Sequence, residues 1–394
     1  MTTGICAGAA TGDRAPAWSG VLAMSLCAFA LVASEFMPVS LLTPVAAALQ
    51  VSEGLAGQGL AISGLCALLT SLFIASLAGP IDRKDLLLWL TGVMCLSGTV
   101  VALAQGYAMY LAGRALIGVV VGGFWSLSAA TAMRLVPPAQ LPQALAILNG
   151  GNALATVVAA PLGSYLGSVI GWRGAFFCLV PVTLATLVWQ AISLPSMPAT
   201  ERAPAAGQVF GLLRQRRVRR GMAALGLFFM GQFMLFTYLR PYLERVTQVQ
   251  GATLSLILLA IGLAGVVGTL LIGACLRRRF YGTLVAIPLL MAALAVALIA
   301  FGSSLWTVVT LLGLWGLVAT AAPVGWWNWL ARSLPHDAEA GGGLMVAVVQ
   351  LAIGSGSTLG GLLFDAAGYR ATFGSSAVLL LLAAGLAWWT ARAD

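Results

Sequence analysis

Residues 161–176, PLGSYLGSVIGWRGAF, recur in altered form as TLGGLLFDAAGYRATF at residues 358–373. At an offset of 197 the two stretches share Leu162/Leu359, Gly163/Gly360, Gly171/Gly368, Arg173/Arg370 and Phe176/Phe373. Two further pairs align at an offset of 198, namely MRLVP (133–137) with ARSLP (331–335) and SGLCALLTSLFIAS (63–76) with IGLAGVVGTLLIGA (261–274). Because the three matches share nearly one offset, close to half the chain length, the sequence predicts a duplicated unit. Parallel repeats of this kind are typical of transporters whose binding site lies between two halves.

The composition predicts a membrane protein. Of the 394 residues 60% are hydrophobic and 8% are charged, whereas soluble domains carry about 25% charged residues. Lipid offers the backbone no hydrogen-bond partner, so apolar runs of about 20 residues should be helices that cross the bilayer. Twelve such runs are predicted, at residues 19–45, 54–79, 86–104, 107–131, 144–170, 174–194, 221–240, 253–275, 282–301, 306–330, 343–364 and 373–391. The expected fold is therefore all-α and integral to the membrane, with twelve transmembrane helices in two pseudo-symmetric six-helix bundles.

One long polar segment divides the chain. Residues 195–220 are rich in Pro, Ala and Arg, so we expect a cytoplasmic tail at 1–18, a first bundle at 19–194, a cytoplasmic linker at 195–220 and a second bundle at 221–394 that ends in a short cytoplasmic tail. With both termini inside, fifteen of the 20 basic residues lie on the cytoplasmic side and four outside, as the positive-inside rule requires. The net charge of +9 is thus explained by topology and by contact with membrane lipids, and no nucleic-acid partner is expected.

Several function classes lack the residues that they need. The sole histidine, His336, is predicted to lie in a cytoplasmic loop, and the six cysteines are scattered without a CxxC pair, so no metal site is expected. No GxxxxGK[ST] motif is present, which excludes a P-loop ATPase. An enzyme embedded in the membrane would need a second catalytic group at the depth of Glu35, and the sequence offers none. A channel is disfavoured by the two-half repeat. We expect no enzymatic activity and no cofactor.

Three loop and helix motifs resemble those of the major facilitator superfamily. LAGPIDRKDLL (77–87) resembles a shortened form of its signature loop, with the usual Gly-Arg-Arg tail reduced to Lys84-Asp85. LAGRALIGVVVGG (111–123) resembles its fourth-helix motif, and GGNALATVVAAPLGSYLG (150–167) resembles the fifth-helix motif of its drug-proton antiporter branch.

Longer stretches resemble the purine ribonucleoside exporter group of bacterial inner membranes. They are SEFMPVSLLTP (34–44), GGFWSLSAATAMRLVPP (122–138), APLGSYLGSVIGWR (160–173), GQFMLFTYLRP (231–241) and PVGWWNWLARSL (323–334). The resemblance implies a monomeric, proton-coupled antiporter of the bacterial inner membrane that exports a small polar solute, such as inosine or guanosine, by alternating access. A multidrug or sugar efflux antiporter of the same superfamily is the alternative. A cationic drug would call for additional acidic residues in the cavity.

Glu35 is the one carboxylate placed well inside an apolar span. A charge at that depth costs about 2.5–3.5 kcal/mol on insertion scales, so such groups usually face a polar cavity and take part in function. Pro38 lacks an N–H and leaves the Ser34 carbonyl without its helical donor, and Arg114 of the fourth span can supply a counter-charge. We predict that Glu35 and Arg114 couple transport to protons. The alternative is a fixed structural ion pair.

Polar or aromatic residues within apolar spans are candidate substrate contacts, because amides can bind base edges and ribose hydroxyls and aromatic faces can stack on a purine. The candidates are Trp125, Asn149, Asn152, Gln232, Tyr238, Trp326, Asn328 and Gln350. The competing interpretation is packing or an interface belt for the tryptophans. For Asn149, Asn152 and Gln350 it is interhelical hydrogen bonding.

Four residues are predicted to take part in gating. Asp82 and Arg83 are expected to form a cytoplasmic gate, whereas Pro161 and Gly163 are expected to permit a kink and close packing of the fifth helix. Asp365 is expected to be solvated at the outer end of the eleventh span.

Overall fold

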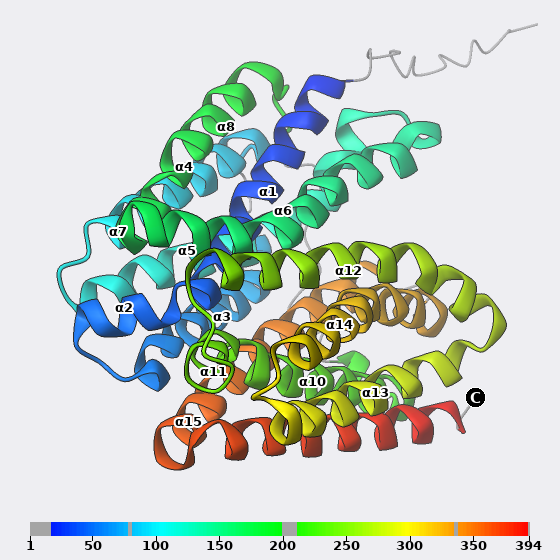
Figure 1. Ribbon diagram of the computed structural model, residues 1–394. Coiled ribbons are helices and arrows are strands. Elements are labelled where there is room, and N and C mark those ends of the chain that lie inside the picture. Colours follow the sequence, from blue (N-terminus) through cyan, green and yellow to red (C-terminus); the bar gives the residue numbers. More distant parts are fainter. Residues whose placement is uncertain (1–16, 78–80, 199–210, 335–337, 393–394) are drawn as a thin grey trace, which may run out of the picture.

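The computed structural model describes residues 17–77, 81–198, 211–334 and 338–392, and within these residues the backbone forms helices and no strand (Figure 1). The first half contains α1 (Trp18–Ser40), α2 (Leu42–Leu49), α3 (Glu53–Leu77), α4 (Arg83–Ala102), α5 (Tyr107–Leu135), the 3₁₀ turn η1 (Pro138–Gln140), α6 (Leu141–Val169), α7 (Gly171–Phe177) and α8 (Leu179–Ser193). The second half contains the 3₁₀ turn η2 (Leu212–Arg214), α10 (Arg216–Phe236), α11 (Leu239–Arg245), α12 (Gly251–Arg278), α13 (Phe280–Phe301), α14 (Leu305–Ser333) and α15 (Ala338–Ala391).

These helices give the twelve predicted spans. Within the described residues, 11 helical segments are long and apolar enough to cross a membrane. The last of them is 51 residues long, about twice the length that one crossing needs, and non-helical angles at Gly368 break it into two helices. The predicted all-α fold of two six-helix bundles is confirmed.

Some predicted boundaries differ from the helices. α10 begins at Arg216, so residues 216–220 of the predicted linker are helical. The centre of the predicted linker and all but the last two residues of the predicted N-terminal tail lie outside the described residues, as does His336.

The duplication is visible in the backbone. Gly171 and Gly368, which align at the offset of 197, adopt left-handed φ angles of 76° and 75°, a conformation that glycine adopts without strain. Gln50 and Gln248 form a second left-handed pair, with φ angles of 56° and 58°. The helix breaks after α1 and after α10 also correspond. The sequence repeat therefore reflects two copies of one backbone path.

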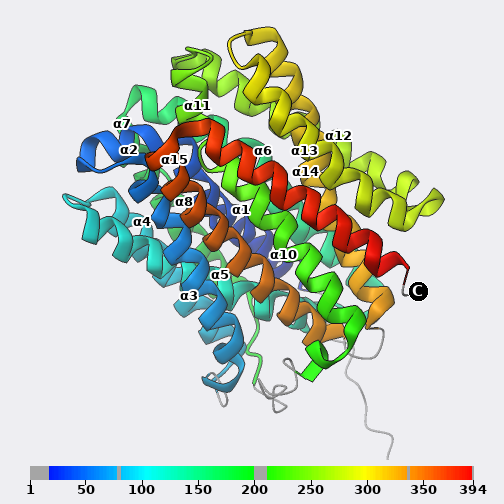
Figure 2. The same ribbon diagram turned by 90° about the horizontal axis from the view of Figure 1, so that it is seen from below.

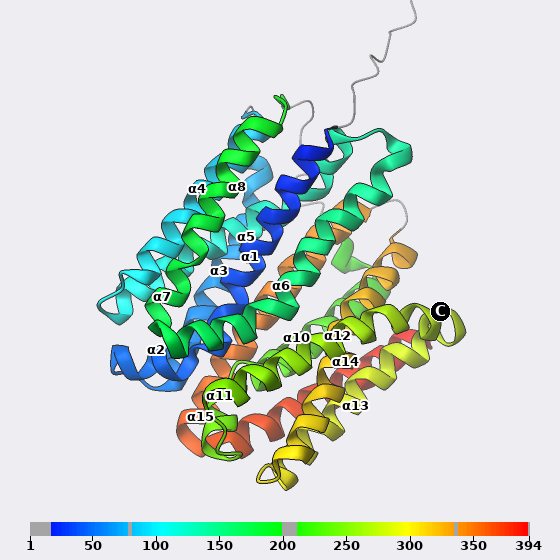
Figure 3. The ribbon, with the colours of Figure 1, turned by 45° about the horizontal axis from the view of Figure 1, so that its top comes forward.

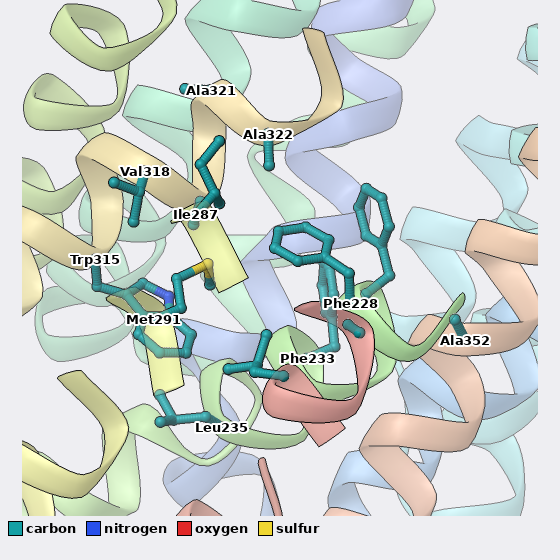
Figure 4. Close-up of a cluster of buried hydrophobic side chains, with 14 of the residues drawn as sticks. Phe228, Phe233, Leu235, Ile287, Met291, Trp315, Val318, Ala321, Ala322 and Ala352 are labelled. Atoms are coloured by element: carbon teal, nitrogen blue, oxygen red, sulfur yellow. The ribbon is translucent and has the colours of Figure 1, made fainter. Parts of the chain in front are cut away.

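Each bundle has a large apolar core of its own. In the second bundle Phe228, Met291 and Trp315 belong to one cluster of buried side chains from α10, α13 and α14 (Figure 4). In the first bundle Met24 and Phe124 belong to the corresponding cluster. A third buried cluster joins the bundles, because it contains Tyr238 and Phe364 of the second half together with Ala56 of α3.

The main contacts between the bundles are those of α3 with α15 (Figure 2) and of α6 with α12 (Figure 1). Small residues allow the close approach, since a Cβ on Gly64 would lie 2.7 Å from the Gln350 carbonyl and one on Gly262 would lie 2.8 Å from Val157 Cα. The bundles converge at the end where α2, α11 and the bend of α15 lie and diverge toward the other end (Figures 1 and 3). We refer to the converging end as the closed end.

Candidate functional site

The Glu35 carboxylate lies where the two bundles meet. α1 and α2 cross as one span that is broken after Ser40, and Glu35 lies about halfway along it. Its side chain is half-buried. The Gln350 amide of α15 in the other bundle donates a hydrogen bond from Nε2 to Glu35 Oε1 at 3.4 Å. One membrane-embedded carboxylate is therefore in contact with both bundles.

Arg114 satisfies the carbonyl that Pro38 leaves free. Its Nη1 donates to the Ser34 carbonyl at 2.8 Å and its Nε donates to the Gly59 carbonyl at 3.3 Å, while the side chain is only 1% exposed. The guanidinium thus joins α1, α3 and α5. One turn later, Gly118 permits this approach, because a Cβ there would lie 2.2 Å from the Ser63 carbonyl.

Glu35 and Arg114 do not form a direct ion pair. Among the described residues the ion pairs within 4 Å are Arg240–Glu244 and Arg245–Glu53. Glu35 and Arg114 instead face a common small cavity of about 10 Å³, together with Phe36, Leu60, Ser63, Phe233 and Ile353. The fixed ion pair considered from the sequence is absent from this arrangement, and the two charged groups are neighbours across a cavity.

Unpartnered polar atoms gather around this cavity. Within the described part of the chain, Arg114 Nη2, Ser63 Oγ and Gln350 Oε1 are buried without a hydrogen-bond partner. Sequence reasoning missed Ser63, because a single serine in an apolar helix carries no signal of its own. Buried polar groups are usually hydrogen-bonded, so three unpartnered atoms near one carboxylate mark a site that can accept a polar ligand.

Three phenylalanines join the bundles, and two of them, Phe36 and Phe233, line the cavity with Glu35. The Phe36 ring of α1 lies 6.0 Å from the Phe233 ring and 6.3 Å from the Phe236 ring, both of α10. Phe36 and Phe236 are half-buried. No sequence pattern selects them, because phenylalanine is common in any apolar span. They offer the aromatic faces that were sought among Trp and Tyr residues.

The structure brings only part of the predicted substrate set toward this site. Gln350 contacts Glu35 directly. Trp125, Asn152 and Gln232 are half-buried, and Gln232 Oε1 is another buried atom without a partner. Asn149 and Asn328 are exposed, and each amide donates to a carbonyl of its own helix, those of Leu145 and Val324.

Tyr238 and Trp326 do not line the cavity beside Glu35. The Tyr238 hydroxyl donates to the Ser357 carbonyl at 2.7 Å and its ring stacks on Phe364 at 5.2 Å. Trp326 is 3% exposed and packs against Trp329 inside the core of the second bundle. Their aromatic character was the only argument for substrate contact. Substrate contact by either residue stays a prediction.

The predicted gating residues lie at two places in the first bundle. Asp82 caps α4 and accepts hydrogen bonds from Lys84 N, Ser196 Oγ and Met197 N. Partial burial raises the pKa of Asp82, but these hydrogen bonds outweigh it and hold the pKa below its ordinary value. The Arg83 backbone N–H donates to the Met197 carbonyl. Asp82 and Arg83 therefore fasten the loop before α4 to the end of α8, within one bundle.

Pro161 and Gly163 lie on α6 opposite the break between α1 and α2. A Cβ on Gly163 would lie 2.7 Å from Ser40 Oγ and 2.8 Å from Met37 Cγ. In the second bundle Gly360 faces Met234 in the corresponding way. The packing is consistent with the close helix contact expected for these positions, and it places them beside the kinked span that carries Glu35.

A polar cluster, here called the latch, joins the bundles at the closed end. It consists of Ser52, Glu53 and Gly54 on one side and Arg245 and Asp365 on the other. The Asp365 carboxylate accepts from Ser52 Oγ at 2.5 Å and from Gly54 N at 3.1 Å, and Arg245 pairs with Glu53. Asp365 is exposed, as predicted, but its carboxylate is engaged by the other bundle.

The fold agrees with what the chain resembles among known proteins. The sequence profile described as Major Facilitator Superfamily matches residues 24–357. The chain belongs to the major facilitator superfamily. As a major facilitator protein it is a multi-pass membrane transporter of small molecules, and the related proteins of this superfamily are transporters and not enzymes.

Two relatives differ in what their names say. The purine ribonucleoside efflux pump NepI of Salmonella typhimurium is 39% identical over 95% of this major facilitator chain and 94% of its own length. The transcription regulatory protein OpdE of Pseudomonas aeruginosa is 64% identical over 96% of this chain and 95% of its own. These relatives and the apolar helices support a location in the inner membrane.

A solved structure has the same fold. A bacterial homologue of the human lysosomal transporter Spinster, in an inward-facing and unoccupied conformation, matches with a TM-score of 0.77 at 15% identity. The match covers 97% of this chain and 98% of that one. At this identity the likeness is to the fold alone.

Proposed function

We propose that this protein exports purine ribonucleosides such as inosine and guanosine across the inner membrane in exchange for protons, by alternating access. One observation carries the proposal: the half-buried Glu35 carboxylate lies at the junction of the bundles and contacts Gln350 of the other half. A membrane-embedded ionisable group is a functional site by default. Its place at the junction lets its protonation state act on the contact between the bundles.

The coupling follows from the cost of a buried charge. A protonated Glu35 is neutral and is tolerated when the bundles close around it, whereas the ionised form favours the conformation in which water reaches it. Arg114 keeps the ionised form accessible, because its positive charge lies across the same small cavity. The proton is therefore taken up on one side and released on the other as access alternates.

The proposed topology places both termini in the cytoplasm, because fifteen of the 20 basic residues then lie on the inner side. The latch would then be the outer gate, and the conformation described here would face inward. Asp82 and Arg83 would belong to the cytoplasmic gate. Pro161 and Gly163 would act as the pivot at which α6 moves against the kinked first span.

The substrate proposal rests on neutral and aromatic groups near Glu35. Phe36 and Phe236 offer ring faces on which a purine can stack, and the amides of Gln350 and Gln232 can bind the base edge or ribose hydroxyls. Trp125 and Asn152 remain candidates because they are half-buried. The name of the NepI relative supports a nucleoside. A cationic drug would be matched by a second carboxylate at this depth, and the spans contain only Glu35 there.

The regulatory name of the OpdE relative is compatible with an exporter. A transporter changes transcription without contacting DNA when it lowers the cytoplasmic concentration of an inducing metabolite. On this proposal any regulatory effect requires transport activity. A Glu35→Gln chain that is present in the membrane in normal amounts should then lose both transport and the regulatory phenotype, whereas an effect that persists in this variant would separate regulation from export.

The decisive experiment combines binding and transport by the purified protein. Thermal shifts would be measured against inosine, guanosine, free purine bases, hexoses and a lipophilic cation, followed by uptake of labelled inosine into proteoliposomes with an imposed pH step. We expect purine ribonucleosides to raise the melting temperature and to accumulate only with a proton gradient. If only lipophilic cations or sugars stabilised the protein, the nucleoside proposal would be wrong and the substrate would belong to the alternative class.

A further inference from the structure

The hydroxyl of Ser63 is free where membrane-embedded hydroxyls are usually bonded. In helices Ser and Thr often donate to the carbonyl four residues earlier, as Ser34 does to Ala30 and Thr91 does to Leu87 in this protein. The corresponding carbonyl for Ser63 is that of Gly59, and it accepts the Nε–H of Arg114. Ser63 is 2% exposed and its Oγ has no partner.

Three polar groups of complementary character line one cavity. Ser63 Oγ can donate and accept, Arg114 Nη2 is a donor without a partner, and the Glu35 carboxylate is an acceptor. The cavity measures about 10 Å³, which is about the space of a single water molecule, and a buried water needs two to four polar partners. The space is too small for a nucleoside, and the positive charge of Arg114 opposes a metal cation.

We propose that this cavity binds one water molecule, held by Ser63 Oγ, Arg114 Nη2 and the Glu35 carboxylate, and that this water passes protons to and from Glu35. On protonation the water gives one of its protons to the carboxylate as it takes a proton from solvent, so the water is regenerated. Deprotonation is the reverse. Arg114 keeps its protons throughout and holds the water oxygen, and Ser63 is a positioning residue. This inference rests on the proposed proton coupling by Glu35.

The test compares Ser63→Ala with a matched serine of the same helix. Ser71 is also on α3, but its hydroxyl donates to the Leu68 carbonyl of its own helix. In proteoliposomes the pH midpoint of inosine transport should move upward by about one unit in Ser63→Ala, because the ionised carboxylate loses hydrogen-bonded support. Ser71→Ala and Ser63→Thr should keep the midpoint of the wild type. Infrared difference spectra on changing pH should contain a water O–D band that Ser63→Ala and Glu35→Gln both lose.

The outcomes separate this inference from the proposed function. If Glu35→Gln still accumulates inosine against a gradient, the proton-coupling proposal fails. If Glu35→Gln loses driven transport while Ser63→Ala keeps both the wild-type midpoint and the water band, the water site alone is wrong. If transport depended on Na⁺ instead of the pH step, the occupant of the cavity would be a cation and not a water molecule. Should Ser63→Ala fail to fold, Ser63→Cys carries the same test, since a thiol is too weak a donor to hold the water.

Discussion

The two halves of the protein place different chemistry on one backbone path. At the offset of 197 residues, Glu35 of α1 corresponds to Gln232 of α10, and Ser34 corresponds to Gly231. The Ser34 carbonyl accepts from Arg114 Nη1 at 2.8 Å, whereas the Gly231 carbonyl accepts from Ser376 Oγ at 2.6 Å. Each half thus braces its kinked first helix at the same carbonyl, with a charged donor in one half and a neutral hydroxyl in the other.

Proline explains why the charged donor is on the first half. Pro38 removes the helical donor of the Ser34 carbonyl, but the corresponding Leu235 keeps its backbone N–H. At the offset of 198 the counterpart of Arg114 is Leu312, which is buried in the core of the second bundle. The duplicated scaffold therefore requires only a hydrogen-bond donor, the brace, at this carbonyl. The first half adds the positive charge of Arg114. In the proposed function this charge supports proton exchange at Glu35.

The largest effect is expected when the charge of Glu35 in the first half is removed. Glu35→Gln keeps size and hydrogen bonding but remains neutral, so proton-driven accumulation should be lost. Exchange of labelled for unlabelled inosine needs no net proton movement and should survive. Expression and melting temperature should be preserved or improved, because a charge in the membrane is removed. Driven transport and exchange would be measured side by side in proteoliposomes with an imposed pH step.

Gln232→Leu is the matched change in the other half. It should weaken apparent substrate affinity and leave the dependence on the pH step intact, because the amide is a candidate substrate contact and carries no proton. If Gln232→Leu uncoupled transport from protons, or if Glu35→Gln accumulated substrate like the wild type, the proposed division between the halves would be wrong.

A second prediction compares the two braces. Arg114→Ala leaves the Ser34 carbonyl buried without a donor, which costs about 1–3 kcal/mol, and it removes the positive charge near Glu35. The melting temperature should fall and the pH profile of transport should move to higher pH. Ser376→Ala leaves Gly231 with its helical donor, so its cost should be about 1 kcal/mol with no change in pH profile. Equal pH profiles for wild type and Arg114→Ala would reduce the arginine to a structural brace.

Much of this comparison could be predicted from the sequence. The repeat, the twelve spans and the carbonyl freed by Pro38 all follow from apolar run lengths, a constant offset and the missing proline N–H. The partner of that carbonyl could not be predicted, because it depends on how closely α5 approaches α3. Gly118 decides that distance, and a sequence does not reveal what a glycine faces.

The residues that surround the candidate site were harder to predict for a related reason. Tyr238 and Trp326 were selected for their aromatic rings, yet packing turns both into the protein. Phe36, Phe236 and Ser63 were passed over because their residue types are ordinary in apolar helices. A polar or aromatic residue type indicates what a side chain can bind. The helix face that it occupies decides whether it can reach a ligand, and these spans are apolar nearly all round.

A third prediction concerns the latch, where the halves meet. A Cβ on Gly54 would lie 2.1 Å from Asp365 Oδ2, so Gly54→Ala should push the carboxylate away and shift the protein toward the conformation that is open at this end. Spin labels at exposed Leu55 and Leu362, in a background without native cysteines, would report the separation. Gly106→Ala, with no atom within 4 Å of its Cβ, is the control. An unchanged distance distribution in Gly54→Ala would show that the latch does not limit opening.

The smallest effect is expected where the halves differ in a helix cap. Asp82 caps α4, whereas its counterpart Arg279 precedes α13 without a side-chain cap. Because the pKa of Asp82 is lowered in the folded protein, its stabilisation is present above the unfolded pKa and is lost as pH falls through the folded pKa. Asp82→Ala should cost about 1 kcal/mol near neutral pH and less in acid.

Arg279→Asp should supply the missing cap and raise the melting temperature slightly near neutral pH. Melting curves of both variants between pH 7 and pH 3 would check the pair. A loss on Asp82→Ala that stayed constant down to the lowest pH would show that the hydrogen bonds do not depend on ionisation.

The neutral Gln232, which corresponds to Glu35 in the second half, also limits how far the proposed exporter could concentrate its substrate. With one titratable carboxylate at mid-membrane, each cycle would exchange one proton for one uncharged nucleoside. A proton-motive force of 100 mV supplies about 2.3 kcal/mol per proton, and each 1.4 kcal/mol is a tenfold ratio. The steady-state gradient would then stop near 40-fold by these estimates. Such an exporter would relieve an excess of nucleoside in the cytoplasm and would leave a working concentration behind.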